Sequence, residues 1–111
     1  MNIAEEIKRD EARAFCRNNG IVMRTILMFF KRGYFKTKEL YLNLKAFDLK
    51  MEDVLSALDY FDDMGYIQTR LIETGETVKP CEAEDDEIEL RLHAKGKLLG
   101  HNLIKDEGIE L

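Results

Sequence analysis

The chain has few of the sequence features that are typical of secreted or membrane-spanning proteins. Its 111 residues include two cysteines, one proline and no tryptophan. Two cysteines so far apart predict reduced thiols rather than a disulfide framework, which favours a cytoplasmic location. The longest apolar run, residues 26–30, is far shorter than the roughly 20 residues of a membrane-spanning helix. Residues 1–6 lack a basic segment leading into an apolar one, so no secretory signal is expected.

Sequence motifs of catalysis and metal binding are missing as well. There is no Gly-rich phosphate loop, no Gly-x-Ser-x-Gly and no His-Glu-x-x-His. Cys81, His93 and His101 lack the close spacing of zinc ligands. Cys16 has no neighbouring histidine to activate it as a nucleophile. The sequence therefore predicts a non-enzymatic protein without metal or cofactor.

Charge is present in quantity but is unevenly distributed. The net charge is −5, yet residues 31–50 hold six basic and two acidic side chains. Residues 51–69 hold five acidic side chains and no basic one, and a further acidic run occupies residues 82–87. Nucleic-acid-binding domains usually present a broad basic face. This chain has a basic strip followed by an acidic half.

Hydrophobic periodicity predicts an α+β domain that is mainly helical. Apolar residues at helical spacing, bounded by glycine and asparagine stop signals, mark the helices. Thr37 is the expected N-cap of the helix that follows the basic residues. The predicted helices cover residues 3–17, 21–32, 37–47, 51–64 and 94–104, with a turn at 18–20 and a stop at Gly65.

Two segments near the end of the chain have the pattern of strands. Residues 66–71 follow Gly65, and residues 87–92 alternate polar and apolar side chains, as in a half-buried strand. A turn at 74–76 lies between them, so a two-stranded hairpin is expected. The acidic run 82–87 is expected to be a solvated, mobile tip of this hairpin.

Two motifs resemble those of bacterial winged helix-turn-helix regulators. Residues 58–67 (LDYFDDMGYI) resemble the end of the family's recognition helix and its entry into the β-wing. Residues 90–97 (LRLHAKGK) resemble the segment that joins the last wing strand to a final helix, with His93 where Thr or Ser is usual. The resemblance implies a single winged-helix domain over residues 1–111, with a core at 21–92, a two-stranded wing, an extra N-terminal helix at 3–17 and a C-terminal helix at 94–104.

The short tail after residue 104 is similar to that of small winged-helix proteins of Mu-like phages and prophages, which implies a phage or prophage origin. The winged-helix resemblance also implies transcriptional control through duplex DNA. It further implies a homodimer formed by terminal helices. The apolar residues expected to bury against a second copy are Leu98, Leu99, Leu103, Ile109 and Leu111.

The candidate contact residues support two functions. If the protein binds duplex DNA, the basic strip and one polar position of the third helix are the expected contacts: Lys31, Arg32, Lys36, Lys38, Lys45, Lys50 and Ser56. Like charges repel at close range, so the acidic third helix is a poor match for phosphates. The alternative is a protein-interaction module that does not bind DNA and presents Asp53, Asp59, Asp62, Asp63, Glu84, Asp85 and Asp86 to a basic partner.

Overall fold

The N-terminal part of the chain forms one long helix. In the computed structural model, which describes residues 2–30 and 32–111, α1 runs without a break from Ile3 to Phe29. The predicted turn at residues 18–20 and the division into two helices are therefore wrong. Asn19 donates a hydrogen bond to the Gly108 carbonyl (2.9 Å), and a Cβ at Gly20 would lie 2.0 Å from the Glu110 carbonyl oxygen. These small and polar residues stay helical because the C-terminal tail packs on them.

The next two helices are present close to where periodicity predicts them. α2 (Thr37–Leu44) leads into the 3-10 turn η1 (Lys45–Phe47), and α3 spans Met51–Asp63. Asp48 ends the helical segment after η1 with a φ of 58°, and Gly65 follows α3 with a φ of 79°. Glycine is the usual residue at this left-handed position because it has no Cβ.

One detail of α2 differs from expectation. Lys36, not Thr37, occupies the N-cap position. Thr37 is the first helical residue and is fully buried, and its hydroxyl oxygen finds no hydrogen-bond partner among the described residues. The apolar surroundings of the helix start therefore outweigh the local preference of threonine for a cap.

The sheet contains one strand more than the predicted hairpin. β2 (Ile67–Leu71) and β3 (Ile88–Leu92) pair antiparallel, with Ile67 opposite Leu92. The short strand β1 (Phe35–Lys36) pairs with the other edge of β3, which gives the antiparallel order β1-β3-β2. A strand of two residues has no alternation to detect, so only its long-range pairing reveals it.

The connection between β2 and β3 folds back on the domain. After the turn at Gly75, the chain returns along the outer edge of β2: the Leu71 N–H donates to Glu76 O (2.8 Å) and the Val78 N–H donates to Thr69 O (3.1 Å). The 3-10 turn η2 (Pro80–Glu82) then packs against α3. The prediction that residues 82–87 form the hairpin tip is therefore wrong, since Glu82 ends η2 and residues 83–87 join η2 to β3.

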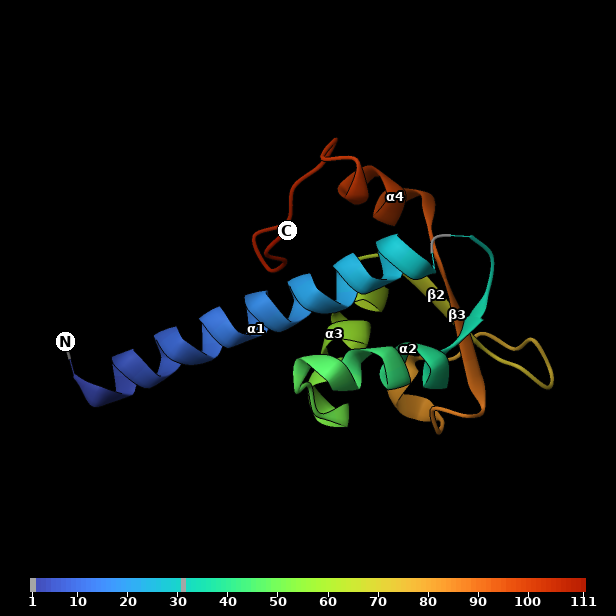
Figure 1. The fold of residues 1–111 in the computed structure, drawn as a ribbon, viewed down its shortest axis with the longest axis horizontal. Coiled ribbons are helices and arrows are strands. Elements are labelled where there is room, and N and C mark those ends of the chain that lie inside the picture. Colours follow the sequence, from blue (N-terminus) through green and yellow to red (C-terminus); the bar gives the residue numbers. More distant parts are fainter. Residues whose placement is uncertain (1, 31) are drawn as a thin grey trace.

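The chain ends in a short helix and a tail that turns back. α4 spans Ala94–Gly100, shorter than the predicted 94–104, and Asn102 ends it with a φ of 58°. The remaining residues return toward α1 (Figure 1). The tail thereby joins the core although it has no regular secondary structure.

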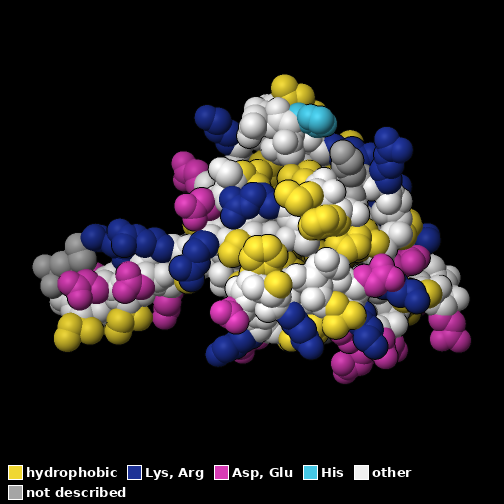
Figure 2. All heavy atoms as spheres, viewed as in Figure 1, with side chains coloured by type: hydrophobic (Ala, Val, Ile, Leu, Met, Phe, Trp, Pro, Cys, Tyr) yellow, Lys and Arg dark blue, Asp and Glu magenta, His cyan; other side chains and the backbone are white. Residues whose placement is uncertain are grey.

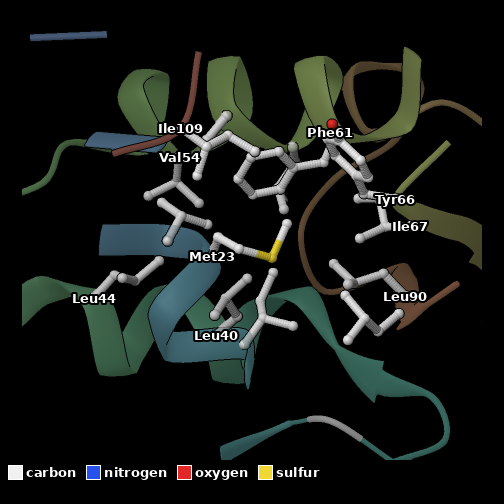
Figure 3. Packing of buried hydrophobic residues seen from close by; sticks show 14 of the residues in the cluster. Met23, Leu40, Leu44, Val54, Phe61, Tyr66, Ile67, Leu90 and Ile109 are labelled. Atoms are coloured by element: carbon white, nitrogen blue, oxygen red, sulfur yellow. The ribbon is translucent and has the colours of Figure 1, made fainter. Parts of the chain in front are cut away.

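The core lies between α1, α2, α3 and the sheet, and Ile109 of the tail packs into it (Figure 3). Ile109 and Leu99 are 6% and 2% exposed, so the prediction that they bury against a second copy is wrong. Leu98, Leu103 and Leu111 remain exposed. None of the helices in the described part of the chain is long and apolar enough to cross a membrane.

Candidate interaction surfaces

The start of α3 uses one of its carboxylates for its own structure. The Lys50 N–H donates to Asp53 Oδ2 (3.1 Å), so Asp53 caps the helix on which it lies. A carboxylate at this place also favours the positive end of the helix dipole. Asp53 and Ser56 line a hollow of about 220 Å³ together with Glu11 and Asn18 of α1. The predicted contacts Asp53 and Ser56 therefore both border α1, where Asp53 is half-buried and Ser56 is exposed.

The second half of α3 is flanked by the segment that leaves β2. η2 packs on α3, and Pro80 is buried there. Burial raises the pKa of Asp62; the adjacent carboxylate of Asp63 raises it further, whereas Lys79 lowers it. Asp59 and Asp62 are half-buried, and Asp63 is exposed. The arrangement leaves only part of the helix exposed.

The acidic loop, residues 83–87, follows η2 and is closed by its own hydrogen bonds. The Glu87 N–H donates to Glu84 O (3.0 Å), and the Glu84 N–H donates to Glu87 Oε1 (3.1 Å). Glu84 and Asp86 are exposed, and Asp85 is half-buried. The contact of η2 with α3 brings Glu82 to the α3 surface, and the loop continues from there toward β3. We call the acidic residues of these three segments the acidic surface: Asp59, Asp62, Asp63, Glu82, Glu84, Asp85 and Asp86.

The basic strip is more dispersed. Lys31, a predicted DNA contact, lies outside the described residues. Arg32 lines a hollow of about 400 Å³ near α4, with Lys97 and His101. Lys36 lines a different hollow, which includes the acidic residues Asp86 and Glu87. Arg32 and Lys36, although only four residues apart, therefore line different hollows.

The rest of the strip follows α2 and the start of α3. Lys38 and Lys45 are exposed, and Lys50 is the exposed N-cap of α3. Lys45 Nζ lies 5.5 Å from the centre of the Tyr41 ring, at the distance of a cation–π contact. These three lysines, like Arg32, do not line the hollow that Lys36 shares with Asp86 and Glu87.

Cations on the sheet are engaged within the protein. Arg70 Nε lies 2.7 Å from Glu89 Oε1, and its guanidinium carbon lies 3.5 Å from the centre of the Tyr34 ring. Arg91 approaches the same ring at 5.5 Å. An arginine already paired with a carboxylate and stacked on a ring offers less charge to a phosphate.

The functional residues that sequence reasoning missed are those that hold the tail. Asp106 accepts hydrogen bonds of 2.5 Å from the hydroxyls of both Tyr60 and Tyr66, and one of 2.8 Å from the Gly108 N–H. We call Tyr60, Tyr66 and Asp106 the tyrosine–aspartate clasp. Burial, followed by the Asp106 carboxylate, raises the pKa of Tyr60 to about 12. Both tyrosines therefore remain protonated donors across the physiological pH range.

The carboxylate in the clasp is held in its charged form. Burial alone would raise the pKa of Asp106, but the hydrogen bonds from Tyr60, Tyr66 and Gly108, together with nearby Lys95, lower it. Further along the tail, the Glu110 N–H donates to Cys16 O (3.0 Å) and the Cys16 thiol donates to Glu107 O (3.3 Å). The only sequence signals of this docking are Gly20 and Asn19 in mid-helix, which resemble a helix stop.

Comparisons with family models, with curated proteins and with solved structures found no match to this chain.

Proposed function

We propose that the chain is a winged-helix domain. The order of elements supports this, because three helices are followed by the β2–β3 hairpin, and β1 precedes α2. The antiparallel order β1-β3-β2 and the glycine after α3 add further support. One fold hosts many activities, so the surface has to suggest the function.

We infer that this domain acts as a protein-interaction module with a basic partner. The observation that carries the inference is the packing of η2 against α3, which occupies part of the helix and brings Glu82 to its carboxylates. Phosphates repel such a surface, whereas a basic peptide or protein face complements it. Complementary charges accelerate association, and salt weakens their effect.

The test measures binding of a labelled arginine-rich peptide by fluorescence anisotropy. The triple variant Asp59→Asn, Asp62→Asn, Asp63→Asn should bind at least tenfold more weakly than the wild type, since three attractive charges are lost. A control variant with the same change in net charge, Glu39→Gln, Asp48→Asn, Glu107→Gln, alters exposed acids away from this surface. Equal losses of affinity in both variants would show that only net charge matters. They would refute the proposal that the peptide binds at the acidic surface.

Duplex DNA is the second candidate partner, favoured by the exposure of Lys36, Lys38, Lys45 and Lys50 along one stretch of chain. Binding would then depend on α2 and its flanks rather than on α3. A random duplex at about 50 mM salt should associate if even non-specific contacts exist. Charge reversal at Lys36 and Lys38 should abolish that association. Absence of binding by the wild type under these conditions would exclude the DNA-binding proposal.

A further inference from the structure

The first half of α1 makes little contact with the rest of the chain. Arg9, Ala12 and Arg13 border a hollow shared with the tail, and Glu11 borders one shared with α3, whereas residues 3–8 line neither. Figure 1 shows this half extending away from the body of the protein, and every residue from 2 to 13 is exposed. An isolated helix of this length is marginal in water, because nucleation is costly and only tertiary packing offsets it. The N-cap Asn2, whose side chain accepts from the Glu5 N–H (2.8 Å), helps to start the helix but buries no apolar surface.

One side of this free half carries its isoleucines, with Asp10 as a charged interruption seven residues after Ile3. Ile3 and Ile7 are 75% and 52% exposed, and Figure 2 shows hydrophobic side chains along one edge of the projecting helix with Lys and Arg along the other. Ile7, Ala14 and Ile21 follow at intervals of seven residues, which places them on one stripe of the helix. Ile21 packs against the core of its own chain. The stripe packs against the core in the second half of α1. It therefore continues into the free half, where it is exposed.

We propose that the occupant of this stripe is the same half of a second copy, running antiparallel. The charge sequence of the helix supports self-recognition. Acidic Glu5 and Glu6 stand at the start, basic Arg13 and Arg17 stand a few turns later, and both signs occur between them. A parallel pair would set each charge beside its own equivalent. An antiparallel pair with its two-fold axis near residues 9 and 10 sets Glu6 beside Arg13 of the second copy.

The same axis also pairs Lys8 with Glu11 of the second copy. Because the contact is isologous, each of these ion pairs occurs twice. Glu6 and Arg13 are themselves seven residues apart, so both flank the apolar stripe on the same side, as charged residues do beside the seam of a coiled coil. The overlap of about 14 residues is about 20 Å long, and small interfaces of this kind form weak or transient complexes. The dimer should therefore depend on protein concentration.

This surface is distinct from the acidic surface of α3 and its loop, so the inference does not rest on the proposed function. It also differs from the dimer predicted from the C-terminal residues, since Leu99 and Ile109 are buried in their own core. Pairing through α1 leaves the acidic surface and the lysines of α2 available in each copy.

The first test is sedimentation equilibrium of the full chain at concentrations from about 10 µM to about 1 mM, over which a weak dimer should form by mass action. Ile7→Glu should remain monomeric throughout, and circular dichroism should show that its body is still folded because Ile7 is exposed. The control Leu103→Glu alters another exposed apolar residue and should dimerise like the wild type. A wild-type chain that stays monomeric, or a dimer lost in Leu103→Glu and kept in Ile7→Glu, would overturn the proposal.

The second test checks the antiparallel direction. Glu6→Arg and Arg13→Glu should each be monomeric alone, because each places like charges together across the two-fold axis. An equimolar mixture of the two variants should form a heterodimer, since both cross-pairs are then oppositely charged. The double variant Glu6→Arg, Arg13→Glu should recover the homodimer. Failure of the mixture to associate would refute the antiparallel arrangement.

Discussion

The two halves of α1 belong to the same unbroken helix but have different surroundings. Residues 3–13 are exposed, whereas the later half contains the buried residues of the helix: Asn19, Gly20, Val22, Met23, Thr25 and Ile26. Apolar residues recur along both halves. The second half packs against α2, α3 and the returning tail. An amphipathic pattern therefore shows that one face of a helix is suited to burial. The fold decides whether other parts of the same chain bury it.

The largest expected effect compares isoleucines in the two halves. Ile26→Ala should lower the free energy of unfolding by about 2–5 kcal/mol, because it removes a fully buried side chain and leaves a cavity. Ile7→Ala should change it by less than about 0.5 kcal/mol, because that side chain is exposed. Urea denaturation of dilute, monomeric protein measures both. Similar losses at the two sites would show that the free half is supported within the monomer.

The second-largest expected effect on stability concerns the tyrosine–aspartate clasp. Asp106→Asn should lower the free energy of unfolding by about 1.5–3 kcal/mol, since the tyrosine hydroxyls lose a charged acceptor. A lowered folded-state pKa stabilises the fold above the unfolded value of about 3.9, and this stabilisation disappears as the pH falls through the folded-state pKa. The difference between wild type and variant should therefore be complete at neutral pH and shrink in acid. A difference that does not vary with pH would rule out the carboxylate as its source.

Gly20→Ala should have a smaller net effect. In an unobstructed helix the change stabilises by about 0.5–1 kcal/mol. Here the new Cβ would meet the Glu110 carbonyl, so the tail must shift, and such overpacking typically destabilises by about 1–3 kcal/mol. We expect a net loss of about 1–2 kcal/mol, with faster hydrogen exchange at the Glu110 amide. A net gain in stability would mean that the tail does not dock on α1.

The smallest effect concerns the tip of the free half. Asn2→Ala removes the side-chain acceptor of the Glu5 N–H and should weaken the first turn by about 1 kcal/mol. Hydrogen exchange should quicken at residues 3–13, while the thermal unfolding midpoint of the body stays unchanged. A lowered midpoint would show that the two halves of α1 unfold together.

The local elements could be predicted because their signals are local. The apolar stripe of α3, Gly65 after it, and the alternation in β3 each lie within a few residues, and the structure has those elements at nearly the predicted bounds. The basic lysines of α2 are exposed as their polarity suggests. The predicted acidic contacts differ more, since Asp53 caps its own helix and Asp62 lies beside Lys79.

By itself the sequence determined the class of the fold, the extent of α2, α3, β2 and β3, and the division into a basic strip and an acidic half. Only the tertiary structure decided that Gly20 continues a helix, that β1 joins the sheet, and that Asp106 fastens the tail to Tyr60 and Tyr66. The physical reason is the range of the interactions. Periodicity and capping act within a few residues, whereas tail docking, strand pairing and the cover of a helix face join residues far apart in the chain.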